Sequence, residues 1–170
     1  MHPNKLKQLN CLRENRKPID KDWLQWFAGF VDGEGSFTYT TRRGGQKRPV
    51  FAIGLNNKDV AILHEIQRVL QLGKIYVHGK ERDVYRNGEK IYHASASTLF
   101  RIAKWAEMWV FAELLAGLLK TSKENSFSAW HDMVKLIAEH PGQGHHRDAM
   151  PDYSQRLALL ADKLSIVNRT

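Results

Sequence analysis

A short segment near the N-terminus is apolar on nearly every side, and it constrains the fold more than any other feature. Asp20 can cap a helix over residues 21–32. The apolar residues of this helix are Trp23, Leu24, Trp26, Phe27, Ala28, Phe30 and Val31. Because the helix has no wide polar face to leave in water, it must be covered all round. This predicts a place in the middle of the molecule or at an interface between subunits, where Ala28 and Gly29 would let another backbone approach closely.

The helix leads directly into an alternating run of acids and glycines, Asp32-Gly33-Glu34-Gly35. Glycine accepts backbone conformations closed to other residues, so we expect a sharp turn that places Glu34 beside the start of a strand. A carboxylate held there suits Mg²⁺, which takes oxygen donors from one or two carboxylates, from phosphate and from water. The alternative is an ordinary helix-to-strand turn with a solvated acid.

Two helix-plus-hairpin units follow one another along the chain. Periodicity predicts strands over 36–42 and 47–56, a helix over 59–72, strands over 74–83 and 90–97, and helices over 98–119, Lys123–Glu139 and Tyr153–Val167. Gly44-Gly45 and Asn87-Gly88 are the expected hairpin turns, and Gly73 is the expected helix C-cap. The order indicates one α+β domain over 20–170. A basic leader over 1–19 precedes it, and we expect the leader to be mobile or loosely docked.

Composition excludes several classes of protein. The 170 residues are 42% hydrophobic and 26% charged, as in globular domains. Glu107 and Glu113 interrupt the longest apolar candidate, 105–119, so no run reaches the roughly 18 residues of a membrane span. The N-terminus lacks the apolar stretch of a secretory signal, and the lone Cys11 excludes an internal disulfide framework. We therefore expect an intracellular protein, in the cytoplasm or an organelle, that is not secreted and has no membrane partner.

The chain carries a formal net charge of +8, and most of the excess lies in predicted strands. Residues 36–97 hold eleven basic and five acidic residues, a net charge of +6. Clustered Lys and Arg attract the phosphate backbone of nucleic acids. A basic stretch of strands therefore indicates a nucleic-acid-binding sheet, and the alternative is a basic surface that only faces solvent.

Residues 27–35 resemble the motif after which the LAGLIDADG homing endonucleases are named. The exchanges keep the chemical type at the key positions. Phe27 and Phe30 stand for leucine, Val31 for isoleucine, Gly33 for alanine and Glu34 for the second aspartate, while Ala28, Gly29, Asp32 and Gly35 are unchanged. The elements that follow also run in the αββαββα order of that family, so the resemblance covers about residues 20–140. It implies an antiparallel DNA-binding sheet backed by helices.

The motif occurs once, and single-motif members of the family act as homodimers. The resemblance implies that two such helices pack together and place two Glu34 side chains near a twofold axis. Glu34 matches the metal ligand and the Gly33 carbonyl a second contributor, so Mg²⁺ is the implied cofactor, replaced by Mn²⁺ or, in a non-cleaving complex, by Ca²⁺. Asp32 is expected to hydrogen-bond backbone amides at the helix interface rather than to bind metal. The implied dimer interface comprises Trp26, Phe27, Ala28, Gly29, Phe30 and Asp32.

Further active-site groups are expected around the scissile phosphate, where polar and basic side chains order water and offset charge. Asn57 matches a position where the family often has a polar residue. Equally, Asn57 or Asp59 could cap the following helix. A basic residue is expected near the start of the helix after residue 119, where Lys123 is favoured over Lys120. Either could instead be a solvated lysine.

Strand alternation separates a core face from an outward face. β-ribbons can enter the major groove, where outward side chains read base edges and basic ones hold phosphates. The candidates for DNA contact are Ser36, Thr38, Thr40, Arg42, Arg43, Lys47, Arg48, Tyr76, His78, Lys80, Arg82, Lys90 and Tyr92. A twofold dimer predicts a roughly palindromic double-stranded site of about two turns of duplex.

The resemblance thus implies an intron-encoded, site-specific endonuclease that hydrolyses phosphodiester bonds on both strands of a long pseudo-palindromic DNA site. Two alternatives share the fold. One is an RNA maturase that assists intron splicing, and the other is a catalytically inactive DNA-binding relative. Glu34 argues against the inactive relative, because a pure binder has no need of two close carboxylates beside DNA phosphates. It argues less strongly against the maturase.

Overall fold

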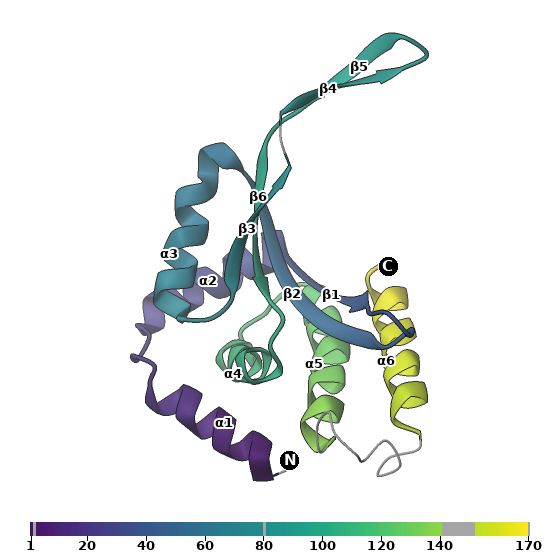
Figure 1. The fold of residues 1–170 in the computed structure, drawn as a ribbon. Helices are drawn as coiled ribbons and strands as arrows, with labels where there is room; N and C mark the ends of the chain where they lie inside the picture. Colours follow the sequence, from purple (N-terminus) through teal and green to yellow (C-terminus); the bar gives the residue numbers. More distant parts are fainter. Residues whose placement is uncertain (2, 80, 141–151, 170) are drawn as a thin grey trace.

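An antiparallel sheet with helices over one face forms the body of the protein (Figure 1). The computed structural model describes residues 1, 3–79, 81–140 and 152–169. The main sheet has the order β1-β2-β6-β3, and the strands are β1 (Gly35–Thr41), β2 (Lys47–Asn56), β6 (Ser97–Ile102) and β3 (Lys74–Gly79). The helices are α1 (Pro3–Glu14), α2 (Lys21–Glu34), the 3₁₀ turn η1 (Asn57–Asp59), α3 (Val60–Leu70), α4 (Trp105–Leu115), α5 (Lys123–Glu139) and α6 (Tyr153–Val167).

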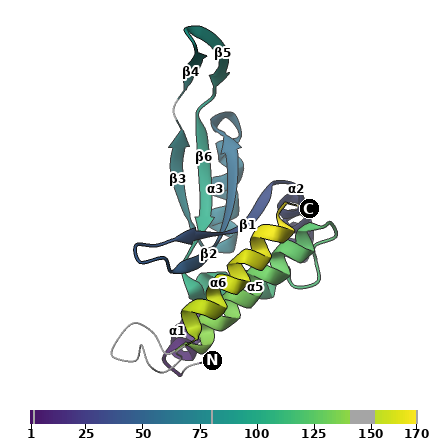
Figure 2. The same ribbon diagram turned by 90° about the vertical axis from the view of Figure 1, so that its right-hand side faces the viewer.

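Alternate strand residues point into a core that the sheet shares with the helices. Phe37 of β1 and Phe51 and Ile53 of β2 are buried, as their alternation predicts. The rings of Phe51 and Phe111 of α4 have centroids 4.3 Å apart. Helices α5 and α6 lie side by side and contact β1 and β2 on this face (Figure 2). The opposite face of the sheet is therefore left uncovered by these helices.

The N-terminal segment is a helix packed on the body. Leu9 of α1 is 1% exposed and belongs to the core cluster, and Arg13 forms an ion pair with Glu113 of α4. The expectation that this leader is loosely docked is wrong, because α1 supplies apolar cover for α4, which is apolar on nearly every side. Within the described ranges, no helix is long and apolar enough to cross a bilayer.

Helix α2 begins as predicted and ends two residues later than predicted. Asp20 is the N-cap, and its carboxylate accepts hydrogen bonds from the amides of Asp22 and Trp23, both at 3.0 Å. Of the two predicted locations, the middle of a single chain is excluded, because Trp26 is 43% exposed and Gly29 and Gly33 are also exposed. The other location, an interface between subunits, stays a prediction. Phe27 and Ala28 face the core of their own chain, at 0% and 2% exposure. Their side chains therefore cannot contact a partner, and this corrects their place in the expected dimer interface.

The prediction of a helix over 98–119 is wrong in its first part. Residues 97–102 form β6, an inner strand paired with both β2 and β3. Thr98, Phe100 and Ile102 are buried while the residues between them are half-buried, which is the alternation of a strand. The expected second hairpin, with strands over 74–83 and 90–97, is also divided. Its base belongs to the main sheet through β3 and β6, whereas β4 (Arg82–Arg86) pairs with β5 (Glu89–Ala94) in a separate two-stranded sheet.

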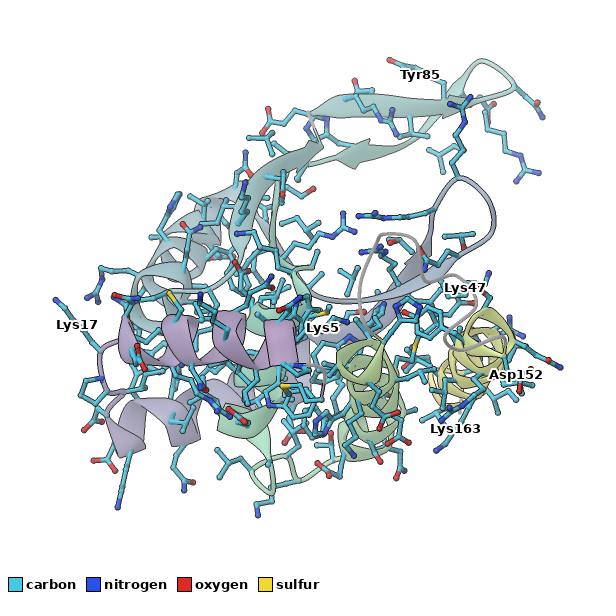
Figure 3. All side chains as sticks on the ribbon, turned by 60° about the horizontal axis from the view of Figure 1, so that its bottom comes forward. Lys5, Lys17, Lys47, Tyr85, Asp152 and Lys163 are labelled. Atoms are coloured by element: carbon cyan, nitrogen blue, oxygen red, sulfur yellow. The ribbon has the colours of Figure 1, made fainter. Side chains whose placement is uncertain are left out.

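The β4–β5 pair forms an arm that extends beyond the body (Figure 1). Asn87 and Gly88 make its turn with φ of 52° and 83°, so the Asn-Gly hairpin turn is confirmed. Tyr85 is 61% exposed and projects from the arm (Figure 3). The arm therefore presents both faces to solvent.

Glycine is required at position 35 because neighbouring atoms lie too close for a side chain, and not because the backbone adopts an unusual conformation there. Its φ is −71°, and Gly33 is helical, so the expectation that these glycines adopt special conformations is wrong. A Cβ at Gly35 would lie 2.7 Å from the Val31 carbonyl oxygen and 3.1 Å from the Phe51 ring. Only glycine fits where α2 turns into β1 against the core.

Replacing Gly35 with alanine is expected to destabilise the protein by about 1–3 kcal/mol, because backbone atoms would have to shift. For a chain of this size each kcal/mol lowers the melting temperature by about 2–4 °C. Gly54→Ala is the matched control, because its Cβ would meet only the Leu99 side chain at 3.6 Å. Thermal unfolding followed by circular dichroism measures both. Equal melting temperatures for the two variants would refute the close-approach argument.

Candidate active site and nucleic-acid interface

Glu34 lies at the junction of α2 with the sheet. It is the last residue of the helix and is exposed, and Gly35 begins β1 immediately after it. The Gly35 amide donates to the Val31 carbonyl and closes the helix. Carbonyl groups in the last turn of a helix have no amide donors from the helix itself. The Gly33 carbonyl and the Glu34 carboxylate thus offer hard oxygen donors at one place, of the kind that Mg²⁺ prefers.

Asp32 ties the end of α2 to the segment that leads into α5. Its carboxylate accepts hydrogen bonds from the Lys120 amide at 2.8 Å, the Thr121 amide at 3.4 Å and the Thr121 hydroxyl at 2.9 Å. The Lys123 amide in turn donates to the Thr121 hydroxyl oxygen at 3.2 Å. Asp32 therefore binds backbone amides, as expected, although within its own chain. Lys120 and Lys123 follow from this anchor, with Lys120 exposed and Lys123 half-buried.

Asn57 is held between the end of β2 and the start of β6. Its Oδ1 accepts a hydrogen bond from the Thr98 hydroxyl at 2.7 Å, and its amide donates to the Ala96 carbonyl at 3.0 Å. The capping alternative is wrong for Asn57, because Asn56 caps η1 by accepting from the Lys58 amide at 3.1 Å. Asp59 occupies the N-cap position of α3, although its side chain makes no capping hydrogen bond. With Oδ1 engaged, Nδ2 is the donor end of the Asn57 side chain.

Glu34 and Asn57 share one end of the sheet. Gly35 pairs with Ile53 across β1 and β2, and Asn56 pairs with Ser97 across β2 and β6. Because the strands are antiparallel, β1 begins at the end where β2 finishes. The candidate acid and the candidate amide therefore lie on the same side of the molecule.

The uncovered face of the sheet carries polar and basic side chains among small and apolar ones such as Ala52 and Leu99. The register places Ser36, Ala52, Arg101 and Lys74 in one row across the four strands. Residues of the same face on β1 and β3 include Thr38, Thr40 and Tyr76, and Tyr76 is 48% exposed. We call this surface the open face, and it contains the predicted Ser36, Thr38, Thr40 and Tyr76.

Arg101 is a member of the open face that the sequence reasoning missed. It stands between Ala52 and Lys74 in the register, and its Nε is buried without a hydrogen-bond partner. It was missed because residues 98–119 are predicted as a helix, in which no outward strand face exists. The alternation of Thr98, Phe100 and Ile102 is the signal that could have found it.

The basic residues at the tip of the β1–β2 hairpin differ in exposure and in the side of the sheet on which they lie. Arg42 and Arg43 are exposed at the turn. Lys47 does not lie on the outward face as predicted. Its Nζ lies 5.1 Å from the centre of the Tyr39 ring, whose hydroxyl is 3.0 Å from the Ser165 hydroxyl of α6, so it is on the side of the helices. Arg48 pairs with Thr40 across β1 and β2, so it lies on the same side of the hairpin as the open face, beyond the point where β6 ends.

Two of the predicted DNA-contact residues of the arm, Arg82 and Lys90, differ in whether they form an ion pair. Arg82 is exposed, whereas Lys90 forms an ion pair with Asp83 at 2.8 Å. Hydrogen bonds from Lys90 and His93 lower the pKa of the Asp83 carboxyl. The charge of Asp83 weakens the attraction of Lys90 for phosphate. Lys80 lies outside the described residues, as do the side chains of His78 and Tyr92.

One side of α2 faces outward and carries two exposed glycines beside a pair of stacked aromatic rings. Gly29 and Gly33 are exposed, one turn apart, and a Cβ on either would meet nothing within 4 Å. Trp26 is 43% exposed and its ring stacks on that of Phe30 with centroids 5.5 Å apart. We call Trp26, Gly29, Phe30 and Gly33 the outer face of α2. A helix with glycines spaced by one turn allows a second backbone to approach closely.

The features described so far are an acid at a helix–sheet junction and, beside it, an open sheet face with basic residues. Residues 27–134 match the family described as LAGLIDADG endonuclease, and the chain belongs to this family. A curated relative, the probable intron-encoded DNA endonuclease 1 of Mycosarcoma maydis, is 36% identical over 70 residues. That alignment covers 39% of this chain and 24% of the relative, so the chain matches about a quarter of its length.

Solved structures share the fold. The meganuclease I-AabMI bound to uncleaved DNA matches with a TM-score of 0.66 and 24% identity, over 84% of this chain and 44% of that chain. The archaeal intron-encoded homing endonuclease I-Vdi141I in complex with DNA matches with a TM-score of 0.65 and 18% identity, over 87% and 86% of the chains. I-CvuI in complex with its target in the presence of calcium gives 0.62 and 20%, over 85% and 80%. The predicted α+β fold of the family is thereby confirmed.

Proposed function

We propose that this chain forms a homodimeric, intron-encoded and site-specific DNA endonuclease that cuts both strands of a long pseudo-palindromic site. The observation that carries the proposal is the position of Glu34, exposed at the end of α2, between the outer face of that helix and the sheet. As a nuclease encoded within an intron, it would act inside the cell, in the cytoplasm or in an organelle.

The outer face of α2 supports the homodimer. Trp26 and Phe30 leave apolar ring surface in water, and Gly29 and Gly33 leave a flat strip beside it. A second α2 laid across this strip would cover the rings and bring the two helix ends together. Each chain would then contribute one Glu34 to a shared centre. The described residues contain no group of three or more metal-ligating side chains, so the second chain and the DNA phosphates supply the remaining oxygen donors in this proposal.

The donors at the end of α2 fit a hard divalent cation. Glu34 and the Gly33 carbonyl would hold Mg²⁺, or Mn²⁺ in its place, while Ca²⁺ would bind without supporting cleavage. The bound ion supplies a Lewis acid for water and for the leaving oxygen. Nearby, Lys123 or Lys120 would offset charge on the phosphate, and the Asn57 Nδ2 group would donate to water or to a phosphate oxygen. The bonds of Asp32 to the Lys120 and Thr121 amides hold these lysines beside the motif.

The open face would hold the duplex. Arg101 and Lys74 stand in one row with the small polar Ser36, so charge for phosphates and room for base edges occur together. The formal charge of +8 favours association with DNA at any sequence. Arg42, Arg43 and Arg82 extend the basic surface toward the hairpin tip and the arm.

A cleavage assay tests the proposal. The full chain is incubated with a library of duplexes that carry candidate intron-less alleles, with Mg²⁺ and separately with EDTA. We expect double-strand cuts at one sequence with Mg²⁺ and none with EDTA. Sequence-specific DNA binding without cutting would indicate the inactive relative. Binding of intron RNA with stimulation of splicing, and no DNA cutting, would indicate the maturase.

A further inference from the structure

Basic side chains from four separate segments line a cavity beside the tip of the β1–β2 hairpin. The cavity has a volume of about 540 Å³, within the range of small-molecule sites. Its basic residues are Lys5 of α1, Arg42 after β1, Arg48 of β2 and Lys104 before α4. Among the described residues that line the cavity, none is Asp or Glu. Lys104 has an acidic partner outside the lining, Glu107, at 2.9 Å.

Lys5 places a positive charge inside the protein. The residue is 8% exposed, its Nζ donates to the Ile137 carbonyl of α5, and it lies 5.4 Å from the centre of the Trp105 ring. A carbonyl and a ring orient an ammonium group without cancelling its charge. Burial and the nearby charge of Arg48 lower the pKa of Lys5 to about 8. Figure 3 shows Lys5 on α1, on the side of the molecule turned toward the viewer, whereas Lys17 points outward at the edge of the view.

Arg48 adds a second partly buried cation. Burial and the charge of Arg42 lower its pKa, and its hydrogen bond is a long one of 3.5 Å to Gln46. Like charges grouped in a partly buried space repel one another, and a bound anion would remove that repulsion. Guanidinium groups match the oxygens of phosphate with two parallel hydrogen bonds.

We propose that this cavity is a phosphate-binding site, formed by Lys5, Arg42 and Arg48 against the wall of Trp105 and Tyr153. The phosphate could be carried by a free small molecule or by the backbone of a nucleic-acid strand that passes the hairpin tip. Both sources present the same chemistry to the three cations. The site contains none of the groups at the end of α2, so it does not depend on cleavage.

Calorimetric titration of the full chain with pyrophosphate, without divalent metal or DNA, tests the site. We expect saturable binding to the native protein and at least tenfold weaker binding to Arg48→Gln. Arg42→Gln, at an exposed position, is expected to weaken binding as well and keeps the test decisive if Arg48→Gln does not fold. Lys17→Gln removes the same charge elsewhere and should change the affinity by less than twofold.

Two results would overturn the proposal: absence of saturable binding, or equal weakening by Lys17→Gln and by the two arginine variants. A competition arm identifies the source of the phosphate. If a short duplex of unrelated sequence displaces pyrophosphate, the site takes nucleic-acid backbone. If the duplex does not displace it but a free nucleotide does, the site takes a small molecule. Either displacement supports the phosphate site.

Discussion

Replacing Glu34 with glutamine is expected to reduce DNA cleavage at least about a thousandfold while DNA binding survives. Glutamine keeps the size of the side chain and removes the charge that would hold the cation. A loss of about 4 kcal/mol of transition-state stabilisation corresponds to this factor. Binding should be unchanged or slightly tighter, because a carboxylate beside phosphates is repelled by them. Gel shift in Ca²⁺ and cleavage in Mg²⁺ separate the two effects.

Glu14→Gln provides the control, since Glu14 is an exposed acid at the end of α1. This variant makes the same chemical change away from the motif, and it should cut DNA at the native rate. Cleavage by Glu34→Gln at the native rate would remove Glu34 from the active site. Loss of both binding and cleavage in a folded Glu34→Gln protein would assign the residue to the DNA interface and not to the chemistry.

The sequence predicted the elements whose signals are local. Both ends of α5 and α6 agree with the prediction, because each has a regular apolar face and flanking polar or turn residues. The N-cap of α2 at Asp20 and the turn at Asn87-Gly88 depend on one or two residues each. Such features need no knowledge of distant parts of the chain.

The errors arose where long-range contacts decide the structure. Strand β6 is inner because β2 and β3 pair on either side of it, and the only local signal for it is the short alternation of Thr98, Phe100 and Ile102 directly before a helix. Similarly, Gly73 was expected to cap α3. It adopts φ of 75° against Phe100 and Arg101, while Gln71 takes the left-handed capping position at φ of 53°. Distant packing therefore overrode the local pattern in both places.

The candidate site shows the same division. The motif predicted the position of Glu34 at the end of α2 and the hydrogen bonds of Asp32 to backbone amides, because both depend on position within α2. The sequence could not show that Thr98 engages Asn57, since this contact follows from the pairing of β6. The prediction of a helix over 98–119 hid Arg101, although the alternation of Thr98, Phe100 and Ile102 places Arg101 on an outward strand face. The face of α2 that is open to a partner also became clear only when Phe27 and Ala28 were found in the core of their own chain.

Replacing Gly29 with leucine is expected to separate dimerisation from folding. A Cβ at this position meets nothing within 4 Å in the single chain, so the side chain has room. In a helix interior, leucine is favoured over glycine by somewhat less than 1 kcal/mol, so the chain should fold at least as well as before. Against a second α2, however, the added side chain would hold the backbones apart. We expect the dimer to be weakened at least a hundredfold, which is about 2.7 kcal/mol.

Sedimentation velocity over a range of concentrations measures the dimer, and circular dichroism measures folding. Gln155→Leu, at an exposed position within α6, adds the same side chain away from the outer face of α2 and should leave the dimer intact. Because each cleavage centre in this proposal needs a Glu34 from both chains, double-strand cutting by Gly29→Leu should fall with the dimer and recover as protein concentration rises. A Gly29→Leu protein that remains a dimer, or a native protein that cuts both strands as a monomer, would contradict the helix-to-helix arrangement and with it the shared metal site.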